Sequence, residues 1–284
     1  MTREAGATVV ELLVASGIML TASAAVFTLV ANATATSPRW NEAADLHQRA
    51  RMALDVVYRT LAPAGAGLTG ALPAIEPRRR FTLSTSPSAI TVRSAPEHGA
   101  RSTLTSDLAP GATVAMIASH AGCASGLIAC GFTAGSEAAI FEGTGSWHLL
   151  AVESTAPSAL SVADRIPGRT TTFAAGATLV EILETSLYFD RVSGTLRQEG
   201  PGAGDFPVLD NVVDVRFEYL GDGLTPMALQ TLVDGPLCGS GSLAYDCDVD
   251  RIRSVRVRIG IAHARPDVPG LTAIADISPR ILQR

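Results

Sequence analysis

The sequence contains no lysine: all 22 of its basic residues are arginine, and they stand against 27 aspartates and glutamates. The resulting net charge of −5 argues against a general nucleic-acid-binding surface, which requires an excess of positive charge. Nucleic acid is therefore an unlikely partner. The densest basic cluster is 78–80, and four more arginines fall at 251–258. We interpret both groups as solvated arginines or as partners for acids on adjacent strands.

Motifs of catalysis and metal binding are also missing. The five histidines have no H-E-x-x-H spacing, and no serine lies in G-x-S-x-G. Residues 65–70 match G-x-G-x-x-G, but they follow a helical pattern where a dinucleotide site needs a strand, which favours a flexible linker. Asp246, Asp248 and Asp250 alternate as calcium ligands can, yet the glycine and distal glutamate of an EF-hand loop are absent. We therefore expect no enzyme, no cofactor and no metal site, although a triad built from distant residues stays open.

Cysteine is scarce, and its spacing excludes two common sites. Six residues separate Cys123 from Cys130 and eight separate Cys238 from Cys247, so neither pair has the C-x-x-C spacing of a zinc knuckle or a thioredoxin-like site. Of the three possible pairings, we favour two local disulfides, Cys123–Cys130 and Cys238–Cys247, over four buried thiols. Disulfides would place the part of the chain that holds them outside the cytoplasm.

A long uncharged segment is the most conspicuous feature present. No charged residue lies between Glu11 and Arg39, and at about 1.5 Å per residue this segment is long enough to cross a ~30 Å hydrocarbon layer. Glu11 stands at its start, where a carboxylate inside an apolar span costs about 2.5–3.5 kcal/mol and usually has a partner. A cleaved signal peptide, suggested by 31–33 (Ala-Asn-Ala), and a plain membrane anchor are the alternatives, and neither explains Glu11.

The stretch Gly6-Ala7-Thr8-Val9-Val10-Glu11, followed by the apolar run, resembles the type IV prepilin signature. In that family a short polar leader ends in glycine, and glutamate is the fifth mature residue. The resemblance implies that a prepilin peptidase cleaves between Gly6 and Ala7 and that the new amine on Ala7 is methylated. It also implies that Glu11 lies opposite the N-terminal amine of a neighbouring subunit in a filament. The first mature residue of the family is usually phenylalanine or methionine, whereas here it is Ala7. This departure bears on methylation more than on cleavage.

Further blocks of the chain are similar to minor pilins of the PilW kind and to J-type pseudopilins of type II secretion. The blocks are RARMALDVVYRTLAPAGAG (49–67), LYFDRVSGTLRQ (187–198), NVVDVRFEYLGD (211–222) and RIRSVRVRIGI (251–261). The middle of the chain, about 95 to 175, matches only in style.

The rest of the sequence predicts a second half of the helix and then strands. Apolar residues recur at helical spacing at Leu46, Ala50, Ala53, Leu54, Val57 and Leu61. After Phe81, short apolar segments alternate with clusters of glycine, proline and serine. The clearest strands are 213–219 and 255–261, whose odd-numbered residues, beginning with Val213 and Val255, are apolar and expected to be buried. We expect the two strands to be antiparallel neighbours, with Asp214 and Glu218 sharing the solvated face with Arg256 and Arg258. Further candidates are 89–93, 113–118, 138–141, 147–152 and 178–190.

We therefore expect an α+β, type IV pilin-like fold in which a long N-terminal transmembrane and amphipathic helix packs on an antiparallel sheet. The expected parts are a leader (1–6), a helix (7–62, with its membrane part at about 7–36), a linker (63–80) and a β-rich domain (81–284). The expected function is that of a minor pilin, which primes or joins a filament near its tip.

A J-type pseudopilin and a secreted or membrane-anchored enzyme or binding protein are the alternatives. The expected partners are prepilin peptidase, other minor and major pilins, and inner-membrane lipid. The expected location is the inner membrane, with the globular part on the periplasmic side and later in a surface filament.

Overall fold

The structure is a computed structural model that describes residues 8–68, 72–79, 85–118, 128–143, 145–165, 169–200, 204–223, 225–238, 245–263 and 269–279. For residues 35–41, 128, 237 and 245 only the backbone is described. The chain forms two compact units, Met1–Arg49 and Ala50–Arg284. Because the division falls within the long helix, its last turns belong to the same unit as the strands.

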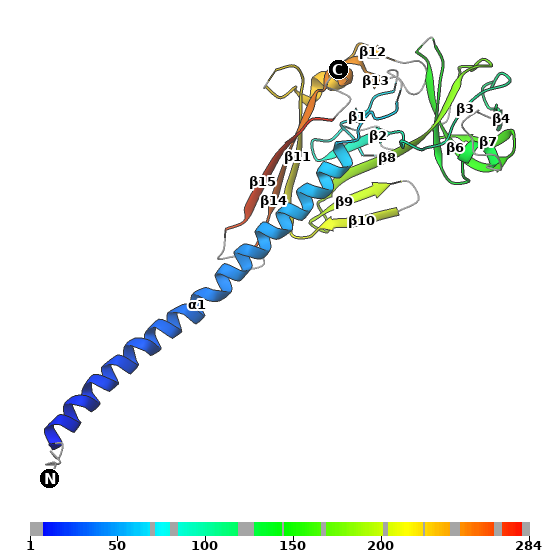
Figure 1. Ribbon diagram of the computed structural model, residues 1–284. Coiled ribbons are helices and arrows are strands. Elements are labelled where there is room, and N and C mark those ends of the chain that lie inside the picture. Colours follow the sequence, from blue (N-terminus) through cyan, green and yellow to red (C-terminus); the bar gives the residue numbers. More distant parts are fainter. Residues whose placement is uncertain are drawn as a thin grey trace. The chain divides into compact units, whose positions relative to one another are not determined.

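One long helix precedes a series of antiparallel strands, which is compatible with the expected α+β class (Figure 1). The long helix is α1 (Val9–Leu61), and three short 3₁₀ helices are η1 (Ile128–Gly131), η2 (Leu229–Leu232) and η4 (Cys247–Arg251). The strands are β1 (Ile75–Glu76), β2 (Ala89–Ser94), β3 (Arg101–Thr103), β4 (Val114–Met116), β5 (Glu137–Phe141), β6 (Trp147–Ala156), β7 (Ala159–Asp164), β8 (Thr178–Asp190), β9 (Thr195–Gly200), β10 (Gly204–Leu209), β11 (Val212–Leu220), β12 (Leu237–Cys238), β13 (Tyr245–Asp246), β14 (Ser254–Ile261) and β15 (Leu271–Ile277). Every strand segment expected from the sequence contains a strand, and 178–190 matches β8 from end to end.

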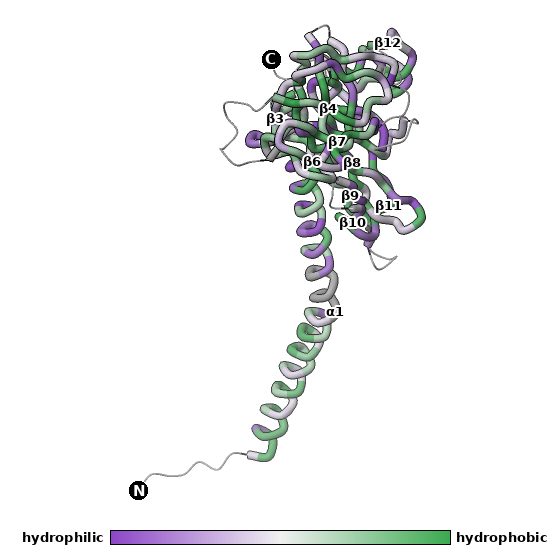
Figure 2. The backbone as a smooth tube through the Cα atoms, turned by 90° about the vertical axis from the view of Figure 1, so that its right-hand side faces the viewer, coloured by the Kyte–Doolittle hydropathy of each residue, from purple (hydrophilic) through white to green (hydrophobic). Residues whose placement is uncertain are grey.

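The helix α1 changes character along its length. Figure 2 shows its N-terminal half as predominantly hydrophobic and its C-terminal half as mixed. In the second half, the residues expected at helical spacing are buried, apart from the half-buried Leu54: Leu46, Ala50, Ala53, Val57 and Leu61. The helix ends where Pro63 follows and Gly65 takes a positive φ of 78°, a conformation that suits glycine after a helix. The Gly65 N–H donates to the Arg93 carbonyl oxygen at 2.8 Å, which fixes the helix end to β2.

The strand β8 organises most of the sheet because its two halves pair with different neighbours. Residues 183–188 pair with β2, and the C-terminal end of β8 also pairs with β9. The N-terminal half, 178–182, lies between β3 and β5. Ser94, the last residue of β2, pairs with Leu183 of β8. The chain between these two residues is therefore an insertion at one end of the β2–β8 pair.

This insertion forms a small closed barrel. The strands follow the order β3, β8, β5, β6, β7 and β4, and the circle closes where Leu104 bridges Ile117. Backbone hydrogen bonds on both sides of that bridge, from Ala118 N to Thr103 O at 2.8 Å and from Thr105 N to Met116 O at 2.9 Å, complete the closure. Closure removes the free strand edges from this part of the sheet.

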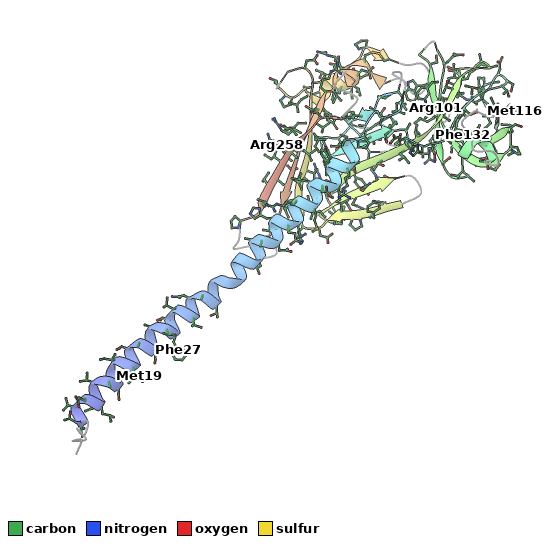
Figure 3. The ribbon with its side chains drawn as sticks, in the orientation of Figure 1. Met19, Phe27, Arg101, Met116, Phe132 and Arg258 are labelled. Carbon is green, nitrogen blue, oxygen red and sulfur yellow. A yellow bond between two sulfur atoms is a disulfide. The ribbon has the colours of Figure 1, made fainter. Side chains whose placement is uncertain are left out.

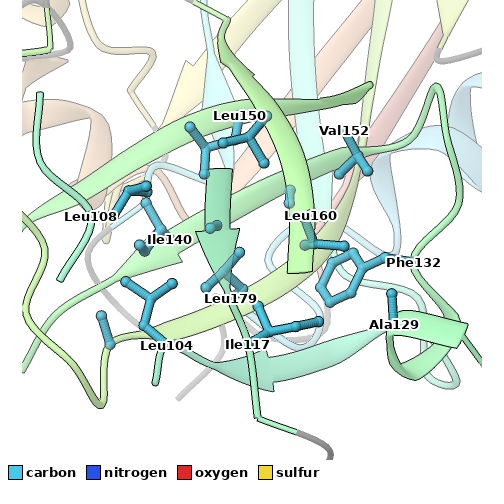
Figure 4. Close-up of a cluster of buried hydrophobic side chains, with 14 of the residues drawn as sticks. Leu104, Leu108, Ile117, Ala129, Phe132, Ile140, Leu150, Val152, Leu160 and Leu179 are labelled. Carbon is cyan, nitrogen blue, oxygen red and sulfur yellow. The ribbon is translucent and has the colours of Figure 1, made fainter. Parts of the chain in front are cut away.

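A separate apolar core fills the barrel. Its buried members all come from residues 100–179 and include Ile140, Leu150, Leu160 and Phe173. Figure 4 shows side chains of this cluster directed into the space that the strands enclose. Alternate residues of β5, β6 and β7 supply them, as the two-residue period of a strand requires.

A second sheet has the order β11, β14, β15. The predicted antiparallel pairing of β11 with β14 is confirmed, and Val255, Val257, Ile259 and Ile261 are all buried as expected. The prediction for Val213 is wrong, because its side chain is 61% exposed and Val212 is buried instead. The register shifts between Val212 and Asp214, and the extra residue of this bulge turns Val213 to the other face.

The charge pairs on the solvated face differ in part from those expected. Arg258 forms an ion pair with Glu218, at 2.9 Å across β11 and β14, as predicted. Arg256 instead contacts Asp276 of β15 at 2.7 Å, and Asp214 contacts Arg216 of its own strand at 3.1 Å. The strand β15, which supplies the partner of Arg256, was not among the segments expected from the sequence.

Candidate functional site

The predicted processing site, Gly6 and Ala7, lies outside the described residues. The described chain begins at Thr8, which directly precedes the first residue of α1. Glu11, the predicted assembly residue, lies in the first turn of this helix.

Thr8 and Glu11 cap the start of α1 by reciprocal hydrogen bonds. The Thr8 backbone N–H donates to Glu11 Oε2 at 3.0 Å, and the Glu11 backbone N–H donates to Thr8 Oγ1 at 3.3 Å. This is the capping-box arrangement, in which two N–H groups that have no partner within the helix are both satisfied. The sequence signal for this cap, T-x-x-E, is present at 8–11.

The capping box gives the Glu11 carboxylate a partner within its own chain. The carboxylate also lies at the helix end where the peptide dipoles sum to positive charge, which favours an anion. One oxygen, Oε2, accepts both from the Thr8 N–H and from the Thr8 hydroxyl, at 3.0 and 3.3 Å.

The apolar part of α1 is long enough to span a membrane. The most apolar 18-residue stretch within Val9–Thr34 has a mean hydropathy of 2.1, and none of it is buried. At about 1.5 Å per residue the 26 residues of Val9–Thr34 extend about 39 Å, more than a ~30 Å hydrocarbon layer needs. Figure 3 shows Met19 and Phe27 extending outward from the helix.

Four hydroxyl groups in this segment donate to carbonyl groups of the helix itself. Ser16 Oγ donates to the Leu12 carbonyl at 2.7 Å, and Thr28 Oγ1 donates to the Ala24 carbonyl at 2.7 Å. Thr21 and Thr34 make the same kind of bond. Because a polar group without a partner is costly in hydrocarbon, these bonds make the exposed surface of the segment compatible with lipid.

Cys238 and Cys247 form the expected local disulfide, with their Cα atoms 5.0 Å apart. The bond connects β12 to the residue that follows β13, and the two strands pair as a short hairpin. Cys130 is also disulfide-bonded, but Cys123 lies outside the described residues, so the pairing of these two cysteines stays a prediction.

A buried ionic cluster, which the sequence did not predict, joins the segment expected to be a linker (63–80) to β2 and β8. The Arg93 guanidinium contacts Glu184 Oε2 at 2.6 Å and Glu76 Oε2 at 3.0 Å, and it donates to the Pro73 carbonyl at 3.2 Å. All three charged residues are at most 4% exposed. Arg78 approaches Glu76 from the other side at 2.6 Å.

The electrostatics of this cluster favour the ionised forms. Burial by itself raises the pKa of Glu76, but the charges of Arg93 and Arg78 outweigh it, so the pKa is lowered from its ordinary value. Burial alone would lower the pKa of Arg93, and the two carboxylates raise it instead. The cluster fixes β1 to β2, so the sheet already begins within 63–80 because paired charges hold that segment against it.

The basic cluster 78–80 serves the partner role expected for it where it is described. Arg79 contacts Glu199 of β9 at 2.9 Å, and its guanidinium lies 3.9 Å from the centre of the Tyr188 ring. Arg80 lies outside the described residues. The arginines at Arg251 and Arg253 contact Asp248 and Asp222.

A second buried polar group lies at one end of the barrel. His148 Nε2, near the start of β6, is 3.4 Å from Asp164 Oδ1 at the end of β7. Arg169 Nε is 3.0 Å from the same oxygen, and its other nitrogens face the carbonyls of Leu108 and Ala112. Burial lowers the pKa of His148, Asp164 raises it and Arg169 lowers it again, so that the net direction is down. The surroundings of the imidazole therefore favour its neutral form.

The remaining sequence patterns do not assemble into a site. Gly65 and Gly67 lie in turns after α1, and Gly67 approaches Ala95 so closely that a Cβ would lie 2.9 Å from it; Gly70 lies outside the described residues. The Asp246 carboxylate accepts from the N–H groups of Asp248 and Gly235, which makes it a cap for the short helix η4. Within the described ranges, no group of three histidine, cysteine, aspartate or glutamate side chains is placed to hold a metal ion.

The chain matches no protein-family model, and no curated protein matches it significantly.

Proposed function

We propose that the chain is a minor pilin, a structural subunit that joins or primes a type IV pilus-like filament and is anchored in the inner membrane before assembly. One observation carries this proposal. A capped, exposed apolar helix with glutamate in its first turn continues without a break into turns that bury an apolar face in the same compact unit as the antiparallel strands.

The continuity of α1 weighs against a removable signal peptide. Cleavage after Ala33 would cut the helix between two of its turns, since α1 runs from Val9 to Leu61. Cleavage after Gly6 leaves the whole helix and its cap intact. The second alternative, a J-type pseudopilin, shares the same helix and the same processing.

The pattern of resemblance also agrees with the fold. The four similar blocks fall on the end of α1, on β8 and β9, on β11 and on β14. The barrel occupies the middle of the chain, where the resemblance is weakest. The proposal is therefore a pilin-like framework of helix and sheet that carries an inserted barrel. The proposal assigns no catalytic step to the framework or to the barrel.

The first test is the N-terminus of the mature protein, determined by mass spectrometry of the full chain from a host with prepilin peptidase. The expected first residue is Ala7. A start at Thr34 would assign a signal peptide, and an intact Met1 or Thr2 would assign a plain anchor. Gly6→Val should leave uncut precursor in the membrane, because a side chain there obstructs the scissile peptide. Normal processing of that variant would remove the prepilin assignment.

The second test separates the two roles open to Glu11, the helix cap and the charge. Glu11→Val should insert into the membrane as well as the native chain or better, because an apolar residue replaces an acid. Its incorporation into filaments or minor-pilin complexes should fall sharply, because the N-terminal amine of a neighbour would then be buried without a counter-charge.

Two matched variants identify which role matters. Glu11→Gln keeps a side chain that suits the third position of a capping box but removes the charge, and it should assemble as poorly as Glu11→Val. Thr8→Val keeps the charge but loses the capping hydroxyl, and it should assemble nearly normally. The opposite ranking, with Glu11→Gln normal and Thr8→Val defective, would show that Glu11 acts through the cap and not through an amine of a neighbouring subunit.

A further inference from the structure

The strand β15 is the outer strand of the second sheet. Its seven residues, Leu271–Ile277, pair with β14 along their whole length. Among the described residues, no strand pairs with its other side. One long edge of this sheet is therefore free.

The direction of the free backbone groups follows from the pairing. The Phe217 N–H donates to the Pro87 carbonyl, so Phe217 directs its backbone groups away from β14. Val257, which lies opposite Phe217, consequently directs its groups toward β15, where its partner is Ala275. Backbone groups alternate along a strand, so the residues on either side of Ala275 face outward. The free edge presents the N–H and C=O groups of Thr272, Ile274 and Asp276.

The side chains at this edge leave the core incompletely covered. On β14 the inward residues Val257 and Ile259 are fully buried. Their neighbours on β15, Ala275 and Ala273, are only half-buried, and so is Leu271. The row of apolar side chains thus continues to the edge and stops without a strand to cover it.

Two other strand edges in the described part of the chain carry a protective feature. The edge strand β10 contains Pro207 and a register shift next to it, both of which prevent regular pairing. The outer side of β11 already accepts Met227 N–H and donates to Pro87. The edge of β15 has neither a proline nor a bulge, and its one charge, Asp276, is held by Arg256 at 2.7 and 2.9 Å.

We propose that the free edge of β15 is a docking site for a β-strand of a different protein subunit, added by main-chain hydrogen bonds. The inference rests on the proposed function and names one contact surface of the assembling subunit. The incoming strand would place apolar side chains beside Ala273 and Ala275, and neutral or basic side chains on the solvated face near Asp276. A second copy of this chain would add another net charge of −5 to the first, which opposes self-association.

The test uses the full chain in detergent and a probe peptide with the sequence SVRVRIGI, which is that of β14, residues 254–261. The peptide alternates apolar residues with arginine, as the docking strand must. Residue-resolved amide hydrogen exchange is measured with and without it. In the chain alone, the amides of Thr272, Ile274 and Asp276 should exchange quickly and those of Ala273 and Ala275 slowly. With saturating peptide, the three outward amides should slow by at least about tenfold.

A matched pair of proline variants identifies the edge. Ile274→Pro removes an outward N–H that the fold does not use, so exchange elsewhere in β14 and β15 should be unchanged while the peptide loses its effect. Ala275→Pro removes an inward N–H and should speed exchange along both strands. A peptide of the same composition without the alternation is the control for the probe.

Two results would overturn the proposal. One is unchanged exchange at the three outward amides with saturating peptide. The other is slow exchange that depends on protein concentration without peptide, which would assign the edge to a second copy of the chain. Neither result depends on where the chain is cleaved, so a failure here is distinguishable from a failure of the minor-pilin assignment, which the Ala7 N-terminus decides.

Discussion

Arg93 holds two buried carboxylates and a carbonyl at once, and this fixes the segment that follows α1. The contacts at 2.6 Å to Glu184 and 3.0 Å to Glu76 lie where almost no solvent reaches. An ion pair in such a place is retained at a desolvation cost, and the greater cost falls on whichever partner is left alone. The effect of removing one arginine on stability should therefore depend more on how deeply its ion pair is buried than on its charge.

Replacing Arg93 by methionine should destabilise the chain by about 3–5 kcal/mol, because both carboxylates would stay buried without a counter-charge. Urea unfolding followed by circular dichroism measures this change. Arg256→Met is the matched control, since its pair with Asp276 is open to solvent, and it should have a much smaller effect. Equal effects of the two variants would contradict the role assigned to the buried cluster.

His148 makes stability depend on pH. Its folded pKa lies below the ordinary value of 6.5, so the unfolded chain binds a proton first as the pH falls. Above 6.5 the imidazole is neutral in both states and contributes no slope. Stability should therefore fall as the pH decreases from 6.5 toward the lower folded pKa. Glu76 adds a loss of the same sign only below its ordinary 4.5.

His148→Gln should flatten that dependence below about pH 6.5, measured as urea midpoints at a series of pH values. His98→Gln, at an exposed histidine, is the control and should keep the native slope. A native slope in His148→Gln would remove the histidine from this account.

Among the elements, the hairpin of β12 and β13 depends most on a covalent link. These strands have two residues each, and the Cys238–Cys247 bond joins their ends across a sequence separation of nine. A strand pair this short has little stability of its own. The crosslink stabilises it chiefly by restricting the unfolded chain.

Replacing Cys238 and Cys247 together by serine should cost about 2–3 kcal/mol, the amount that a loop of this size predicts. Thermal unfolding of the oxidised proteins measures the difference, and the other two cysteines stay in place as an internal control. Non-reducing peptide mapping of the same samples tests the Cys123–Cys130 bond. A crossed pairing there, or free thiols, would contradict the expected topology of the chain.

On the scale of the whole molecule, the barrel is an insertion with a core of its own. Every buried member of its apolar cluster lies between Ala100 and Leu179, while Ser94 and Leu183 at its two ends are paired neighbours. Among the described strands, β8 is the one that belongs to both barrel and framework, and Arg101 of β3 also donates to the Gly67 carbonyl at 3.0 Å. Each part can therefore bury its own apolar surface.

Replacing residues 96–181 by a short glycine–serine turn should leave the framework folded, because β2 and the second half of β8 would then form a simple hairpin. Amide exchange of β11, β14 and the last turns of α1 should keep its native protection, and the Cys238–Cys247 bond should still form. Loss of protection throughout the chain would show that the barrel is required for the framework to fold.

The sequence by itself determined the features that depend on local periodicity. The length of the apolar segment, the buried face of α1 from Ala50 to Leu61 and the inward row of β14 all follow from spacings of 3.6 and 2 residues. Even the cap of α1 was legible as threonine followed three residues later by glutamate.

Only the tertiary structure decided which distant segments meet. Closure of the barrel at Leu104 and Ile117, the partner of Arg256, and the contacts that bury Arg93 join residues far apart in the chain. The exposure of Val213 was decided in the same way, because a bulge changes the face of a residue without changing the local alternation of apolar and polar side chains. Periodicity specifies which face of an element is buried, whereas the choice of neighbour depends on hydrogen bonds and charges that form only when the whole chain has folded.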